Sequence, residues 1–233
     1  MRHPLNRIPT RRLALTALLL VAAVALAALP AQAFTGTLLA ADLAILGTGN
    51  WIETGPTGIE WTVTQNADES WHYSYLFWHP KGETSHFILE TSTSFTAGNI
   101  FNASGDFSLL DVGWQEVGSG NPNMPERVYG IRFDEAWDLN TELAFDSDRA
   151  PIWGDFYAKN GNAGGFGPNT AWNAGFTLND SDPFAAPQDG SLDHHLLVPD
   201  TDSDLTPIPE PSAMLLLSSG LLGAWVARRR LLG

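Results

Sequence analysis

Regular alternation of apolar and polar residues is the feature that most constrains how this chain can fold. Residues 59–64 alternate throughout, and one face of residues 71–78 carries only aromatic side chains: Trp71, Tyr73, Tyr75 and Phe77. A period of two residues is typical of a strand with one buried face. Pro80 and Gly82 then predict a turn, after which residues 86–91 return as the antiparallel partner in a hairpin.

Short apolar segments separated by glycine, proline, asparagine and aspartate continue along the chain. Further strands are predicted at 106–112, 129–133, 143–146, 152–159 and 172–178. No stretch sustains the spacing of a long amphipathic helix. The pattern favours an all-β fold, namely a single antiparallel β-sandwich or jelly-roll-like domain over residues 34–178.

The chain contains no cysteine, which excludes disulfides, zinc–thiolate sites and thiol nucleophiles. Residues 34–206 hold five of the 12 basic residues and 25 of the 26 acidic ones, so their net charge is about −20. Such a charge repels nucleic acid and anionic lipid but is compatible with divalent cations and neutral glycans. We therefore expect no nucleic-acid partner.

Residues 1–33 have the three parts of a removable signal peptide. Four arginines precede an apolar run at 13–29, and Ala31 and Ala33 form a small-residue cleavage site. We expect the secretion translocon to export the chain and the mature protein to begin at Phe34. Residues 10–15 partly resemble a twin-arginine signal, so the export route stays open, with the general secretory route favoured.

Residues 208–233 contain a second set of three parts. The sequence Pro209, Glu210, Pro211 comes first, and its prolines keep the backbone extended. An uncharged apolar run at 213–227 is predicted to form a transmembrane helix, although at about 1.5 Å per residue it is shorter than the hydrocarbon core. Three arginines then provide a positive stop on the cytoplasmic side: Arg228, Arg229 and Arg230.

This order of parts resembles the PEP-CTERM sorting signal of exported Gram-negative proteins. The resemblance covers residues 208–233 and leaves the preceding body unassigned; Ile208 stands where the family usually has valine. It implies that the tail is held in the inner membrane and processed by an exosortase-type sorting enzyme beside the Pro-Glu-Pro motif. It also implies delivery to the cell surface or to an extracellular matrix that contains exopolysaccharide.

Residues 179–207 are polar and acidic and are predicted to be a linker between the domain and the anchor segment. Asp200, Asp202 and Asp204 are spaced like the oxygen ligands of a calcium loop, but the glycine and the closing glutamate of such a loop are missing. We favour a solvated linker here. Structural calcium elsewhere in the domain stays open, and no other cofactor is expected.

Three histidines, His72, His79 and His86, recur every seven residues and would gather on the predicted hairpin. Two imidazoles and a carboxylate can hold a metal, but polar residues at hairpin ends are more often there for solvation, so no metal site is predicted. No nucleophile elbow, zinc-protease helix or phosphate loop is present in the sequence. We expect a protein that is not an enzyme and assign no catalytic residue.

Tryptophan is abundant between residues 34 and 206. Exposed tryptophans stack on sugars, because the apolar face of a pyranose ring lies flat on an indole. Trp153 and Tyr157 share one face of the predicted strand 152–159, opposite Ile152 and Phe156, and are therefore candidate glycan-stacking residues. The alternative, which we favour, is that both faces are covered and these aromatic residues fill the core.

The sequence thus predicts an exported cell-surface or extracellular-matrix protein whose β domain has a non-catalytic role that the sequence does not specify. Two alternatives stay open. One is a carbohydrate-binding module for exopolysaccharide. The other is a secreted glycan-active hydrolase, for which no carboxylate pair can be selected among so many acids.

Overall fold

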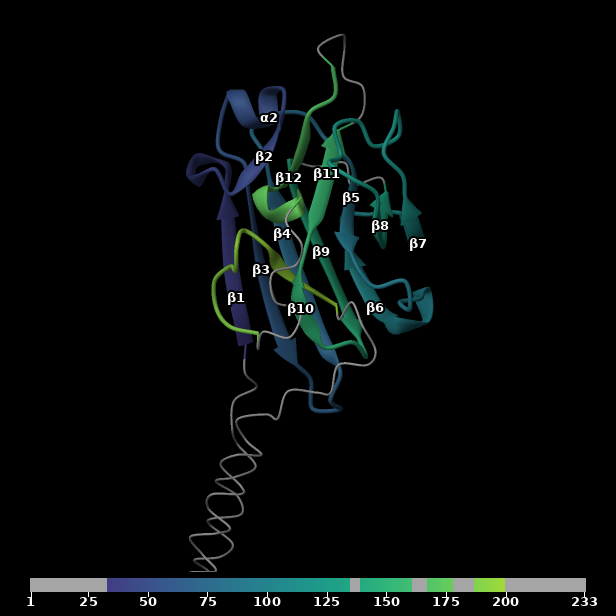
Figure 1. The fold of residues 1–233 in the computed structure, drawn as a ribbon. Helices are drawn as coiled ribbons and strands as arrows, with labels where there is room; N and C mark the ends of the chain where they lie inside the picture. Colours follow the sequence, from purple (N-terminus) through teal and green to yellow (C-terminus); the bar gives the residue numbers. More distant parts are fainter. Residues whose placement is uncertain (1–32, 135–138, 161–166, 178–186, 200–233) are drawn as a thin grey trace, which may run out of the picture. The chain divides into compact units, whose positions relative to one another are not determined.

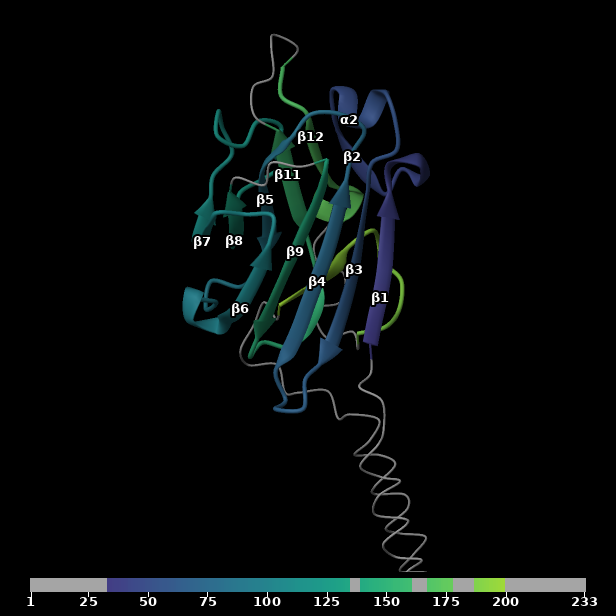
Figure 2. The same cartoon turned by 180° about the vertical axis from the view of Figure 1, so that it is seen from behind.

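The computed structural model describes residues 33–134, 139–160, 167–177 and 187–199, which form two antiparallel sheets around a shared core (Figures 1 and 2). The five-stranded sheet has the order β1 (Ala33–Leu39), β3 (Gly58–Gln65), β4 (Trp71–Trp78), β9 (Asn140–Ser147), β6 (Ile100–Gly105). The six-stranded sheet has the order β2 (Ile45–Thr48), β12 (Thr170–Asn173), β11 (Phe156–Asn160), β5 (Thr84–Glu90), β8 (Val128–Asp134), β7 (Leu109–Gln115).

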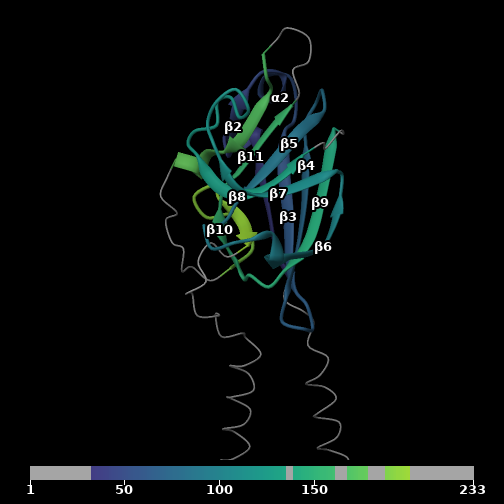
Figure 3. The ribbon, with the colours of Figure 1, turned by 90° about the vertical axis from the view of Figure 1, so that its right-hand side faces the viewer.

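Short elements complete the described chain. A separate two-stranded sheet pairs β10 (Pro151–Gly154) with β13 (Leu196–Pro199), and in Figure 3 the yellow-green β13 lies beside β10. The helices are η1 (Ala40–Asp42), α2 (Asn50–Glu53), η2 (Ala97–Asn99) and η3 (Ala174–Thr177). In the described ranges none of them is long and apolar enough to cross a membrane.

The alternating segments form strands with the predicted faces. In β3 the side chains of Ile59, Trp61 and Val63 are buried, and in β4 those of Tyr73, Tyr75 and Phe77 are buried. These side chains contact the other sheet across the core. The ring centroid of Phe77 lies 5.8 Å from that of Phe87 on β5 and 5.9 Å from that of Phe156 on β11. The predicted all-β antiparallel fold is confirmed.

The predicted hairpin between 71–78 and 86–91 is wrong. Strand β4 pairs with β3 and β9, whereas β5 pairs with β11 and β8 in the other sheet. The intervening turn, with Gly82 at φ 89°, carries the chain from one sheet to the other. Both strands have bulky apolar inner faces, and facing each other across the core buries these faces more completely than lying side by side.

Several predicted boundaries also differ. The segment 152–159 is two strands, which separate at Asp155, and 172–178 is a strand only to Asn173 before η3 begins. The prediction did not include β1, β2 or β6, whose residues mix small, polar and apolar side chains. Part of the predicted linker 179–207 is also folded, because the side chains of Leu196, Leu197 and Val198 in β13 are buried in the main core.

A second, smaller core lies on the outer face of the six-stranded sheet. Ile88 on β5, Val128 on β8 and Tyr157 on β11 are buried there with Met124 and Phe176 from outside the strands. Cross-strand register explains this arrangement, since Ile88 pairs directly with Tyr157 and both therefore point to the same face. The segment between β7 and β8 contributes Met124 and covers this face.

Candidate functional site

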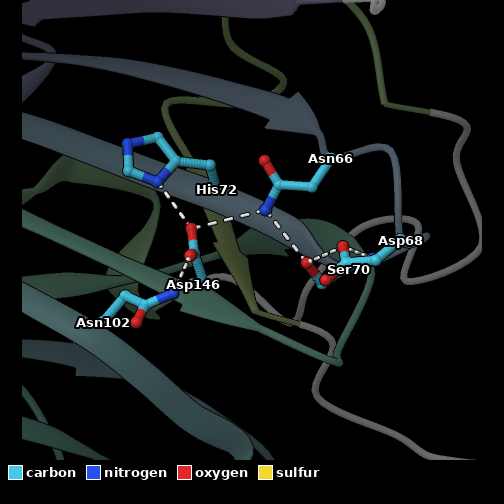
Figure 4. Close-up of polar contacts among 6 residues, drawn as sticks. All are labelled: Asn66, Asp68, Ser70, His72, Asn102 and Asp146. Carbon is cyan, nitrogen blue, oxygen red and sulfur yellow. Dashed lines mark hydrogen bonds and ion pairs between the residues drawn. The ribbon is translucent and has the colours of Figure 1, made fainter.

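Six polar side chains form a hydrogen-bonded cluster on the solvent-facing side of the five-stranded sheet (Figure 4). They come from the end of β3 and the following turn, from β4, from β6 and from β9: Asn66, Asp68, Ser70, His72, Asn102 and Asp146. The strand register explains the hydrogen bond between His72 and Asp146, because these two residues are direct cross-strand partners on β4 and β9. The pairing of β6 is irregular between Phe101 and Ser104, and this irregularity turns Asn102 toward Asp146.

Asp146 accepts the central hydrogen bonds of this cluster. Its Oδ1 accepts from Nδ1 of His72 at 2.7 Å and from Nδ2 of Asn66 at 3.4 Å, and its Oδ2 accepts from Nδ2 of Asn102 at 2.7 Å. Burial acts to raise the pKa of Asp146, but the three donated hydrogen bonds outweigh it and hold the pKa below its usual value. The carboxylate therefore fixes the imidazole of His72 with Nδ1 as the donor.

Ser70 is not placed as a nucleophile for this imidazole. Its hydroxyl donates to Oδ1 of Asp68 at 2.6 Å and accepts from Nδ2 of Asn66 at 2.9 Å. The hydrogen bonds from the Ser70 side chain and backbone lower the pKa of Asp68. The hydrogen bonds of this cluster thus link four neighbouring strands of the sheet. They do not form a serine–histidine–aspartate triad. Apart from His72, its members had no sequence signal, because they come from separate segments.

The three histidines considered as a metal group lie in three different environments. His72 belongs to the outer cluster. His79 is buried with its ring stacked 4.2 Å from that of Trp51, and its Nε2 lies 3.0 Å from the Thr84 hydroxyl. His86 is buried on the opposite sheet beside Arg132 and Tyr157. Among the described residues, no three His, Asp or Glu side chains are grouped so as to hold a metal ion.

A buried polar cluster joins β13 to the rest of the domain. Oδ1 of Asp155 accepts from Nδ1 of His195 at 2.9 Å and from Nδ2 of Asn173 at 2.6 Å. Asn173 in turn accepts from the Phe156 amide, and the Asp155 amide donates to Glu90. The side chains of His195 and Asn173 are fully buried, so this cluster has no access for a substrate. Its role is to hold the chain before β13 against the β10–β11 junction.

The candidate glycan-stacking residues Trp153 and Tyr157 are both buried, so they are not available to a sugar in the folded domain, and the favoured alternative that they fill the core is the one the structure shows. Their strand breaks at Asp155, so Trp153 enters the main core while Tyr157 enters the second core and donates to the Pro122 carbonyl at 2.7 Å. Among the described tryptophans the most exposed is Trp114 on edge strand β7, at 50%. The guanidinium carbon of Arg127 lies 4.5 Å from its ring centroid.

An open pocket of about 340 Å³ lies where α2 meets the segment between β7 and β8. Its lining is polar: Thr48, Gly49, Asn50, Glu53, Asn123, Gly167 and Pro168. Glu53 is the one carboxylate among these lining residues, whereas glycoside hydrolysis needs two that face each other. This pocket therefore gives no support to the hydrolase alternative.

The residues of the predicted targeting segments lie mostly outside the described ranges: Ala31, the anchor run 213–227, Pro209, Glu210, Pro211, Arg228, Arg229 and Arg230. Ala33 is described and is the first residue of β1, where it pairs with Thr64. Comparison with known families decides the nature of the C-terminal segment, since a model of the PEP-CTERM protein-sorting motif matches residues 207–230.

The chain carries a PEP-CTERM sorting motif. The match includes the Pro-Glu-Pro sequence, the apolar run and the three arginines, as the sequence predicted. No curated protein and no solved structure matches the chain significantly. The PEP-CTERM motif is therefore the basis on which a function can be argued, and an exosortase is the processing partner that such a motif implies.

Proposed function

We propose that this protein is exported, processed at its PEP-CTERM motif by an inner-membrane exosortase-type enzyme, and delivered to the cell surface or extracellular matrix as a non-catalytic component. The observation that carries the proposal is the motif match at 207–230. A signal-peptide pattern at 1–33 supports export, since the enzyme acts on chains that reach the outer side of the inner membrane. The strongly acidic body and its lack of cysteine fit an exported domain that relies on packing.

Replacing both prolines of the motif, Pro209→Ala with Pro211→Ala, is expected to abolish processing. Without these prolines the helix that the sequence predicts for residues 213–227 could begin nearer Ile208, and the extended segment that the enzyme is proposed to recognise would be lost. Intact mass and cell fractionation, with and without the sorting enzyme, measure the outcome. The native chain should lose its tail only when the enzyme is present, while the variant keeps its tail and stays in the membrane.

Pro207→Ala is the matched control, because it removes a nearby proline and leaves the Pro-Glu-Pro sequence intact; this control should be processed normally. A native chain with the same mass and the same location in both strains would refute the proposal.

Exopolysaccharide binding is a second candidate, favoured by the exposed indole of Trp114. Arg127 beside it adds a donor that can bond to sugar hydroxyls, and Tyr129 meets the indole edge-on with ring centroids 5.6 Å apart. We expect Trp114→Ala to weaken polysaccharide binding about tenfold, as measured by fluorescence titration. Val117→Ala, at an equally exposed apolar neighbour, should have little effect. No binding of matrix polysaccharide by the native domain would remove this candidate.

A further inference from the structure

The segment 116–127, which we call the flap, covers a polar site on the outer face of the six-stranded sheet. Its contacts with the rest of the domain include a hydrogen bond from Nδ2 of Asn123 to the Thr48 hydroxyl at 3.3 Å and the packing of Arg127 on Trp114. The Tyr157 hydroxyl donates to the Pro122 carbonyl at 2.7 Å, Nζ of Lys159 donates to the Gly120 carbonyl at 2.7 Å, and Met124 is buried in the second core. Most of the flap residues before Met124 are exposed, so these few contacts hold it closed.

His86 lies beneath the flap with its side chain 1% exposed. Its surroundings carry more positive than negative charge. On β8, Nη2 of Arg132 lies 3.5 Å from the imidazole Nδ1, and Oδ1 of Asp134 lies 4.0 Å from the same nitrogen. On β11, Lys159 is the cross-strand neighbour of His86, and the ring centroids of Tyr157 and His86 are 6.0 Å apart. From the flap, the Asn121 side chain approaches the ring, while Glu116 pairs with Arg127 at 3.6 Å on the outside.

The Asp134 carboxylate offsets a charge on His86 only in part, because it is shared with Arg132. Both of its oxygens accept from Nε of Arg132, and Oδ1 also lies 2.8 Å from Nη2 of the same guanidinium. Burial and the positive charges of Arg132 and Lys159 lower the pKa of His86 to about 3. The imidazole is therefore neutral while the flap is closed.

We propose that the flap is an acid-released cover: it is closed over neutral His86 at pH 7, and it opens when the imidazole takes up a proton from the solvent. With the flap open, water reaches the ring and relieves its burial, so the imidazole binds a proton more readily than in the closed state, although Arg132 and Lys159 stay beside it on β8 and β11. The open state thus binds more protons than the closed state in the acidic range above about pH 3. Opening is consequently favoured as the pH falls through this range. Opening would expose Met124 and the apolar side chains beneath it.

Met124 provides the measurement, because it is the one methionine between residues 34 and 206 and its side chain is 2% exposed. Hydrogen peroxide converts an accessible methionine to its sulfoxide, so the oxidation rate of Met124 reports flap opening. Peptide mass spectrometry of the oxidised full-length chain follows Met124 separately from the other methionines. Between pH 7 and pH 5 we expect the rate to rise several-fold, while the near-ultraviolet circular dichroism stays constant.

Two variants make the experiment decisive. His86→Gln keeps a neutral polar side chain and should oxidise at the slow rate at both pH values. His72→Gln removes a histidine from the opposite sheet and should keep the full rise. A native rate that does not change with pH would overturn the proposal, as would a rise retained in His86→Gln. A fast rate at both pH values in His86→Gln, or loss of the circular dichroism signal at pH 5, would also contradict it.

Discussion

Replacing Asp155 with alanine is expected to lower the free energy of unfolding by about 3–5 kcal/mol. The carboxylate is the shared acceptor for His195 and Asn173, and both of these side chains are fully buried. Without it, two buried donors lose their partner in a place that water does not reach. The loss also detaches the chain before β13, so Leu197 and its neighbours lose part of their packing.

Urea unfolding followed by tryptophan fluorescence measures this change. Asp111→Ala is the matched control, since Asp111 is an exposed aspartate on edge strand β7, and its stability should stay within about 0.5 kcal/mol of the native value. A double-mutant cycle with His195→Ala should show strong coupling, because the second substitution removes a donor that already lacks its acceptor. Equal effects for Asp155→Ala and Asp111→Ala would show that the buried cluster does not stabilise the domain.

Strand positions could be predicted from the sequence wherever one face alternates cleanly. β3, β4 and β8 lie within a residue or so of their predicted ranges, because the period of two reports burial on one side of each strand. The partner of each strand could not be predicted in the same way. The connection from β4 to β5 has the composition of a hairpin turn, yet it crosses between sheets. Turn residues allow a reversal without specifying the direction of the returning strand.

The two polar clusters could not be predicted from the sequence, for a related reason. Asp155 interrupts a run that reads as one continuous strand, and its partners His195 and Asn173 lie far away in the sequence. His195 belongs to a stretch that composition assigns to an acidic linker, although Leu196 and Val198 beside it are apolar and buried. The PEP-CTERM motif, by contrast, is local and depends on order and composition, so the sequence alone was sufficient to predict it.

Trp153 and Trp114 offer a direct comparison between a core tryptophan and a surface one. The Trp153 side chain is 1% exposed and lies on β10 opposite Leu197, whereas the Trp114 side chain is half exposed at the sheet edge. Trp153→Ala should cost about 3–5 kcal/mol of stability, because the cavity it leaves removes contacts with both β13 and the main core.

Trp114→Ala should cost no more than about 1 kcal/mol, since it gives up one edge-on ring contact and one cation–π contact at the surface. Thermal unfolding of the two variants, together with their polysaccharide titrations, separates the two roles. If Trp153→Ala kept its stability while losing glycan binding, the face of β10 would have to be accessible and Trp153 would belong to a binding surface. We expect the opposite pair of results: stability depends on Trp153, and any sugar contact depends on Trp114.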